Sequence, residues 1–237
     1  MVDPWHQGLL DDAAPLAGGL AAAPAWLDAP YRSMIGGVVL PDDRLAAADR
    51  ALPPERELPC RVINTGGAGG LVALARRRSD RLRPTGVRTA LRDLDDLAGA
   101  VARVAVAARE LDPDLTVAVE LPDAPNWATA VTAAELEGLA AAVADGPSTG
   151  AGSAGTAERL SALIEADVPF VITGPVRSAD RVIELITTVL ELIDGEPPAA
   201  GVPSAEAGAR LRRRLLGIEV ADVTEVVDDL AARGWAG

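Results

Sequence analysis

Four polar side chains share one face of three predicted strands, which span residues 87–92, 116–121 and 168–173. Alternate residues of a strand point to the same side, and the apolar sets of these strands are expected to pack beneath helices. The polar side chains on the opposite side are then Arg88, Arg92, Glu120 and Thr173. A guanidinium can bind a carboxylate or phosphate, and a carboxylate can act as a general base or a metal ligand.

Arg92, Glu120 and Thr173 also stand at the carboxyl ends of these strands. Asp93 and Asp123 follow directly in the loops. Barrel enzymes build their active sites at that end of the strands. One interpretation is a pocket in which the arginines and Thr173 bind an anionic ligand, while Glu120 and one of the two aspartates perform catalysis. The other, which we favour, is a structural Arg92–Glu120 ion pair that fills a barrel interior poor in aromatic side chains.

A glycine-rich loop with Thr65, Gly66 and Gly67 at its start follows a predicted strand and precedes a helix. Backbone N–H groups at such a helix start can bind phosphate or carboxylate. The spacing departs from the G-x-G-x-x-G dinucleotide motif, because Val72 stands where the last glycine is needed. We therefore favour a tight turn that requires glycine and keep the anion site as the alternative.

The basic residues narrow the chemistry further, because all 22 of them are arginine. Arginine stays protonated and cannot form an imine with a carbonyl substrate. The chain has one histidine, His6, and one cysteine, Cys60. These counts exclude Schiff-base aldolases, pyridoxal phosphate enzymes, Walker A ATPases, internal disulfides and cysteine-rich metal sites. We expect no cofactor and no metal ion.

The formal net charge of −13 at pH 7 argues against binding to negatively charged partners. A field of that sign repels nucleic acid and anionic membranes, so we expect neither. No basic residue precedes Arg32, which is unlike a secretory signal. The uncharged run over residues 13–27 contains two prolines and is too short to span a bilayer. We therefore expect a cytoplasmic protein.

Apolar runs alternate with helical patterns from residue 34 onward, which is typical of a parallel sheet with crossover helices. The predicted strands cover residues 35–40, 61–65, 87–92, 116–121, 168–173 and 218–220. These alternations favour an α/β fold of the parallel (β/α) barrel type, TIM-barrel-like, over an open doubly wound sheet. We predict a single barrel domain over residues 34–237 and an irregular N-terminal arm over residues 1–33, which are rich in Pro, Gly and Ala.

Three stretches of the chain fit more than one structure. Residues 138–143 fit either the end of a helix or a strand. Residues 145–155 have the composition of a long mobile loop, and residues 195–203 form an irregular link where a further strand is expected. The sequence therefore also allows a distorted or incomplete barrel.

Five segments are specific enough to compare with a known family, and together they extend over most of the chain. They are YRSMIGGVVLPDDRL, NTGGAGGLVALARR, ALRDLDDLAG, VELPDAPNW and VVDDLAARGW. They resemble an uncharacterised family of actinobacterial proteins, and the resemblance implies a barrel-like fold.

Proteins of that family carry K-F-R-T-G-G and F-K-x-T-A-G-L-H-H strands, whose lysines and histidines look like catalytic or ligand-binding groups. Here Val171 stands where the second lysine would be, and no histidine pair follows. Arg92, Asp93 and Glu120 match the family. The resemblance therefore implies a shared fold with half of the site missing.

These observations leave three functions open. The one we favour is a barrel-derived protein with a degenerate active site, a pseudoenzyme that binds a small anionic ligand or a protein partner. The alternative is a carboxylate- or metal-dependent lyase, isomerase or hydrolase that acts on a small anionic substrate through Glu120. The third is a structural subunit that associates with a second copy of itself or with a related barrel.

Overall fold

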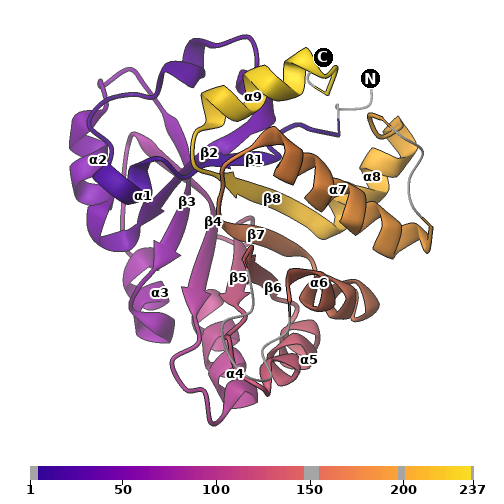
Figure 1. Ribbon diagram of the computed structural model, residues 1–237. Coiled ribbons are helices and arrows are strands. Elements are labelled where there is room, and N and C mark those ends of the chain that lie inside the picture. The colour runs from indigo at the N-terminus through magenta and orange to yellow at the C-terminus, as the bar shows by residue number, and fades with distance from the viewer. Residues whose placement is uncertain (1–4, 147–154, 197–200, 236–237) are drawn as a thin grey trace.

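The strands form a closed barrel in which every neighbouring pair is parallel, as a computed structural model of residues 5–146, 155–196 and 201–235 shows (Figure 1). The eight strands follow one another in sequence order. They are β1 (Leu10–Asp12), β2 (Ile35–Pro41), β3 (Leu58–Asn64), β4 (Leu82–Ala90), β5 (Thr116–Glu120), β6 (Ala140–Ala144), β7 (Phe170–Val176) and β8 (Leu215–Val220). This confirms the predicted TIM-barrel-like (β/α) fold, with the full set of strands rather than an incomplete one.

The helices lie outside the strands, as Figure 1 shows. The α-helices are α1 (Pro15–Gly18), α2 (Leu45–Ala51), α3 (Gly67–Ala75), α4 (Leu97–Ala108), α5 (Trp127–Glu137), α6 (Thr156–Glu165), α7 (Ala179–Asp194), α8 (Ala205–Arg214) and α9 (Val223–Ala232). Short 3₁₀ turns cover Ala25–Asp28, Arg32–Met34 and Asp42–Arg44. No helix among the described residues is both long and apolar enough to cross a membrane.

Apolar side chains at helical spacing form the faces that α4 and α7 turn towards the strands. The buried side chains at helical spacing are Leu97, Val101 and Val104 in α4, and Val182, Ile186 and Val189 in α7. Asp96, Ser178 and Asp222 each accept a hydrogen bond from a backbone N–H in the first turn of α4, α7 and α9. Such capping satisfies donors that the helix leaves free, and it fixes where each helix starts relative to the preceding strand.

The first strand lies inside the segment that we expected to be an irregular arm. Leu10–Asp12 form β1, which pairs with β2 on one side and with β8 on the other. This strand therefore closes the barrel, and the expectation of an irregular arm is wrong at this point. With only three residues and two adjacent aspartates, β1 is too short to show the alternating pattern by which a strand is recognised.

The strand interpretation of residues 138–143 is the right one. Helix α5 ends at Glu137, and Gly138 adopts a left-handed conformation with φ of 66°. The chain then enters β6, whose alanine-rich sequence has little strand propensity of its own. Most of the predicted mobile loop, residues 147–154, and part of the second irregular link, residues 197–200, lie outside the described residues.

Candidate functional site

Side chains that point into the barrel form two contrasting groups. The first, which we call the apolar wall, consists of Ala118, Ala140, Ala142, Val171 and Leu216. The second, which we call the charged wall, consists of Asp11, Arg61, Arg88, Glu120 and Glu219. Large branched side chains usually fill the interior of such barrels. Here two arginines extend across the interior, and the wall around β6 and β7 is made mostly of alanine and valine.

Asp11 and Arg61 form the more deeply buried ion pair of the charged wall. Arg61 Nε donates to Asp11 Oδ2 at 2.5 Å, and the Asp11 side chain is completely buried. The pair reaches from β3 to β1 and fits because two neighbouring positions are glycine. A Cβ at Gly36 would lie 2.6 Å from Asp11 Oδ1, and one at Gly217 would lie 2.7 Å from Asp11 Oδ2. The glycines therefore provide the space that this ion pair occupies.

Arg88 stands between two carboxylates. Its Nη1 donates to Glu120 Oε1, and its Nε lies 3.0 Å from Glu219 Oε1. Arg88 pairs in register with Ala118, two residues before Glu120, so the first contact is a diagonal one between adjacent strands. The second contact crosses the barrel from β4 to β8. The Glu219 side chain is 1% exposed and that of Glu120 is 29% exposed, so Glu120 is the carboxylate that solvent reaches.

Burial changes the acidity of two carboxyls in the charged wall. It raises the pKa of Glu219 to about 7, with the negative charges of Asp11 and Glu120 adding to the effect and Arg88 and Arg61 opposing it. Burial also raises the pKa of Asp11, against the lowering effect of Arg61. A carboxyl whose pKa lies near neutrality can exchange a proton under ordinary conditions.

The predicted Arg92–Glu120 ion pair does not form, because Glu120 pairs with Arg88. Strand β4 ends at Ala90, so Arg92 lies beyond the strand and its direction no longer follows strand alternation. The Arg92 guanidinium instead donates to the backbone carbonyl of Thr65 and lies close to Gly67. Arg92 therefore belongs to the rim of the barrel and not to its interior.

The glycine-rich loop is explained largely by packing within the chain. Gly67 has a φ of 61°, and a Cβ at Gly66 would lie 2.8 Å from the Cα of Gly70. The backbone N–H of Thr65 donates to Asp42, and that of Gly66 donates to Asn64 Oδ1. Two of the N–H groups considered for anion binding are thus already used. The tight-turn interpretation fits this geometry, and a role of Thr65, Gly66 and Gly67 as ligand contacts stays a prediction.

Three predicted site residues remain: Asp93 and Asp123 in loops at the mouth, and Thr173 in β7. Asp93 Oδ2 accepts from Arg103 at 3.1 Å, and Asp123 Oδ1 accepts from Arg159 at 3.2 Å. Thr173 is buried in β7, on the same face of the strand as Val171. The structure therefore gathers Arg88, Glu120 and Thr173 on the inner face, as the strand pattern predicts, and ties the two aspartates to arginines on the rim.

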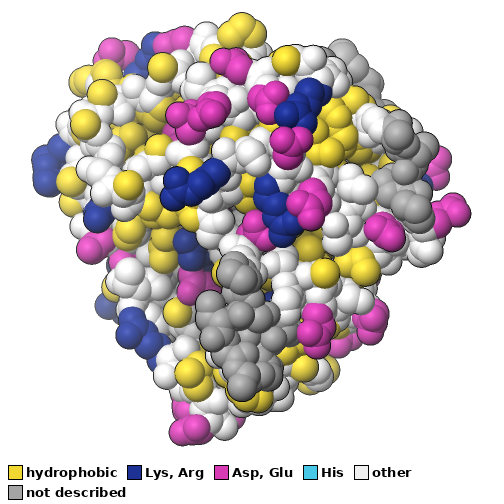
Figure 2. Space-filling model, in the orientation of Figure 1, with side chains coloured by type: hydrophobic (Ala, Val, Ile, Leu, Met, Phe, Trp, Pro, Cys, Tyr) yellow, Lys and Arg dark blue, Asp and Glu magenta, His cyan; other side chains and the backbone are white. Residues whose placement is uncertain are grey.

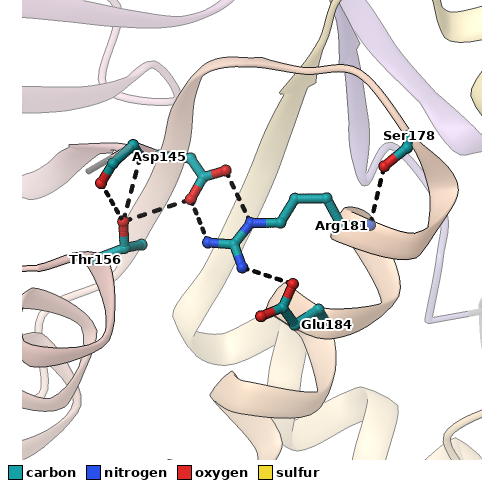
Figure 3. Close-up of polar contacts among 6 residues, drawn as sticks. Asp145, Thr156, Ser178, Arg181 and Glu184 are labelled. Carbon is teal, nitrogen blue, oxygen red and sulfur yellow. Dashed lines mark hydrogen bonds and ion pairs between the residues drawn. The ribbon is translucent and has the colours of Figure 1, made fainter.

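A second polar group holds the ends of β6 and β7 together, as Figure 3 shows. Arg181, in the first turn of α7, donates to Asp145 Oδ2 from Nε at 3.0 Å and to Oδ1 from Nη2 at 2.5 Å. The same guanidinium pairs with Glu184 at 2.7 Å. The Thr156 hydroxyl lies 3.4 Å from Asp145 Oδ1. This group is saturated by its own members, which makes it a structural clamp at the rim.

Ion pairing of this kind recurs on the surface. In Figure 2, some of the dark blue arginine side chains, near the centre and above it, lie directly beside magenta acidic ones. Within the described residues, no three His, Cys, Asp or Glu side chains are arranged to hold a metal ion. Cys60 is buried between β3 and the helices, where burial raises the pKa of its thiol to about 12. His6 packs edge-on against Trp5, and burial lowers its pKa.

Strand alternation alone identifies only part of the charged wall. Arg61 alternates with the outward-facing Cys60 and Val62, and Glu219 alternates with Ile218 and Val220. Both could have been found in the predicted strands from this signal. Asp11 could not, because the sequence gives no strand pattern around it.

Neither a comparison with protein-family models nor a search of curated proteins gave a match for this chain. The barrel fold and the two walls therefore carry the functional argument.

Proposed function

We propose that the protein is a barrel with a degenerate active site that binds a small anionic molecule at the carboxyl-end mouth. The observation that carries this proposal is the sharing of Arg88 between two carboxylates. Glu219 is buried, whereas Glu120 is partly exposed and can turn towards solvent. An entering carboxylate, phosphate or sulfate group would then replace Glu120 on Arg88, because a guanidinium forms paired hydrogen bonds with such groups.

The rim supports the same proposal with a second cation. Arg92 is anchored on the Thr65 carbonyl and borders a space of about 50 Å³, which is also lined by Gly67, Arg103 and Asp93, the last of which is paired with Arg103. That volume corresponds to about two water molecules. It suits the anionic head of a small molecule rather than a large ligand.

The side chains of the mouth favour binding over covalent catalysis. Among the described residues there, none is lysine, histidine or cysteine, the types that most often form covalent intermediates or transfer protons. Val171 lies on the apolar wall where the resembling family has a lysine. We include membership of that actinobacterial family in the proposal, with this chain as its binding-only variant.

A proton-transfer enzyme is the second candidate. It is supported by the unequal environments of Glu120, which solvent reaches, and Glu219, which is buried, because proton-transfer enzymes place their acid and base carboxyls in different environments. In that case Glu120 would be the base that touches a small anionic substrate. Asp93 and Asp123 would act on the rim, where each is paired with an arginine.

Self-association is a separate proposal, carried by two exposed apolar side chains on neighbouring helices. Val106 in α4 is 60% exposed and Leu136 in α5 is 80% exposed. If a second copy covers this surface, Leu136→Glu shifts the sedimentation coefficient from that of a dimer to that of a monomer. A wild-type protein that sediments as a monomer at high concentration overturns this proposal.

Calorimetric titration with sulfate and with succinate tests the anion site directly. We expect wild type to bind at least one of them and Arg88→Gln to lose that binding. Arg213→Gln is the matched control, because Arg213 is exposed on α8 and has no ion pair among the described residues. Circular dichroism of each variant checks that it is folded. Unchanged binding by a folded Arg88→Gln protein would overturn the proposal.

A further inference from the structure

The charged wall divides into two parts with different charge balance. Asp11 and Arg61 form a one-to-one pair. Arg212, on α8, lies close enough to Asp11 to lower its pKa, and its guanidinium donates to the Leu215 carbonyl. Arg88, by contrast, faces both Glu120 and Glu219. The second part therefore has one cation for two carboxyl groups, and it is neutral only when one of them holds a proton.

The geometry shows which of the two carboxyls that is. Glu120 makes the direct hydrogen bond with Arg88 and also reaches solvent, so it has both a cationic partner and water beside it. Glu219 Oε1 is buried and has no hydrogen-bond partner, although Arg88 Nε lies 3.0 Å away, because the N–H does not point at this oxygen. The other oxygen receives only a long contact of 3.5 Å from Arg88 Nη2.

The neighbours of Glu219 strengthen this assignment. Its partner in register on β1 is Asp11, which is also inside the barrel and whose Oδ1 has no hydrogen-bond partner. Two adjacent buried carboxylates repel each other, so one of them tends to keep a proton. Arg61 is already engaged by Asp11, which leaves Glu219 as the carboxyl with the poorer compensation.

We infer that Glu219 carries a proton in the folded protein near neutral pH, so that an anion arriving at Arg88 competes with one carboxylate rather than with two. The part of this inference that concerns the anion rests on the proposed function. Its consequence is a site that binds anions well while Glu219 is protonated and poorly once Glu219 ionises. Arg88 is then drawn towards the interior by a full negative charge. The anion site is in this way regulated by pH from the opposite side of the barrel.

The pKa of Glu219 places its ionisation in the physiological pH range. Burial raises its pKa to about 7 from an unfolded value of 4.5. A group whose pKa is higher in the folded than in the unfolded protein contributes its full stability when the pH is below the unfolded-state pKa. That stability is lost as the pH rises through the folded-state pKa. Between about pH 5 and pH 7 the folding equilibrium constant of wild type should therefore fall by about tenfold per pH unit relative to Glu219→Gln, which cannot ionise.

Denaturant unfolding across about pH 5 to 8 measures this difference without any ligand. Glu191→Gln is the matched control, because Glu191 is exposed on α7, and it should follow wild type at every pH. Parallel curves for wild type and Glu219→Gln would show that Glu219 is ionised throughout, and would overturn the inference.

Sulfate titration over the same range tests the coupling to the anion site, since sulfate keeps its charge there. The sulfate affinity of wild type should fall by about tenfold from pH 6 to pH 8, which is the ratio of the protonated fractions of a group with a pKa of about 7. Glu219→Gln should bind with constant affinity. If neither protein binds any anion while the stability difference persists, the proposed function fails and the proton on Glu219 stands. Binding by wild type that does not change with pH overturns the coupling.

Discussion

The apolar wall and the charged wall enclose the same interior and fill it in opposite ways. The apolar wall uses alanines, Val171 and Leu216, none of which has a polar side chain. The charged wall uses two arginines that reach from β3 and β4 to β1, β5 and β8. Small side chains on one wall leave the volume that long side chains of the other wall occupy. The two walls are therefore complementary in size.

The same contrast distinguishes the two ion pairs of the charged wall. Asp11 has no exposed surface and one direct partner. Glu120 has 29% of its side chain exposed, and its partner Arg88 also faces the carboxyl group of Glu219. We therefore expect the first pair to be essential for folding and the second to be available for ligand exchange.

The largest expected effect comes from removing Arg61. Arg61→Met leaves the Asp11 carboxylate buried without its direct cation, and the loss of unfolding free energy should be about 3–5 kcal/mol. Arg56→Met, which breaks an exposed pair with Asp28, should leave stability close to that of wild type. Urea unfolding measures both variants. If the two variants are equally stable, the loss of Arg61 does not leave Asp11 as an uncompensated buried charge, and the account of this pair is wrong.

An intermediate effect is expected on the apolar wall. Ala142→Val adds two methyl groups to a side chain that is 2% exposed, and overpacking should lower the free energy of unfolding by about 1–3 kcal/mol. Ala144→Val is the control on the same strand and face, where the side chain is exposed, and its effect should be within about 0.5 kcal/mol. A stable Ala142→Val protein would mean that the interior holds space that the charged wall does not fill.

The smallest expected change in stability comes from Glu120. Glu120→Gln should cost about 1 kcal/mol, because the Glu120 side chain is partly exposed and glutamine keeps an oxygen that can accept from Arg88. Had the carboxylate been fully buried on a single arginine, the expected cost would be about 3–5 kcal/mol. Thermal or urea unfolding separates these values, and a loss in the larger range would contradict the placement of Glu120 at the mouth.

The sequence predicts the fold better than the site, for physical reasons that are visible in particular residues. The apolar face of α7 and the capping of α9 by Asp222 rest on residues close together in the chain, and such local patterns are what the alternation of strands and helices is predicted from. The short β1 and the alanine-rich β6 have no such pattern, since only pairing with neighbouring strands makes them strands.

Strand alternation correctly places Arg88 and Glu120 on the inner face but gives Glu120 the wrong partner. Alternation fixes the direction of a side chain only as far as the strand extends, and β4 ends before Arg92. The contacts of Arg61 with Asp11 and of Arg88 with Glu219 cross the barrel, and no sequence spacing encodes them. Their discovery required the closed structure.

Sulfate calorimetry on wild type and Glu120→Gln tests the central claim most directly. Glu120 is the carboxylate that an incoming anion must displace from Arg88, so its replacement by glutamine should make sulfate bind more tightly. Tighter binding by Glu120→Gln, with Arg213→Gln at the wild-type value, is the result predicted here. Equal or weaker binding by a folded Glu120→Gln protein would contradict the account.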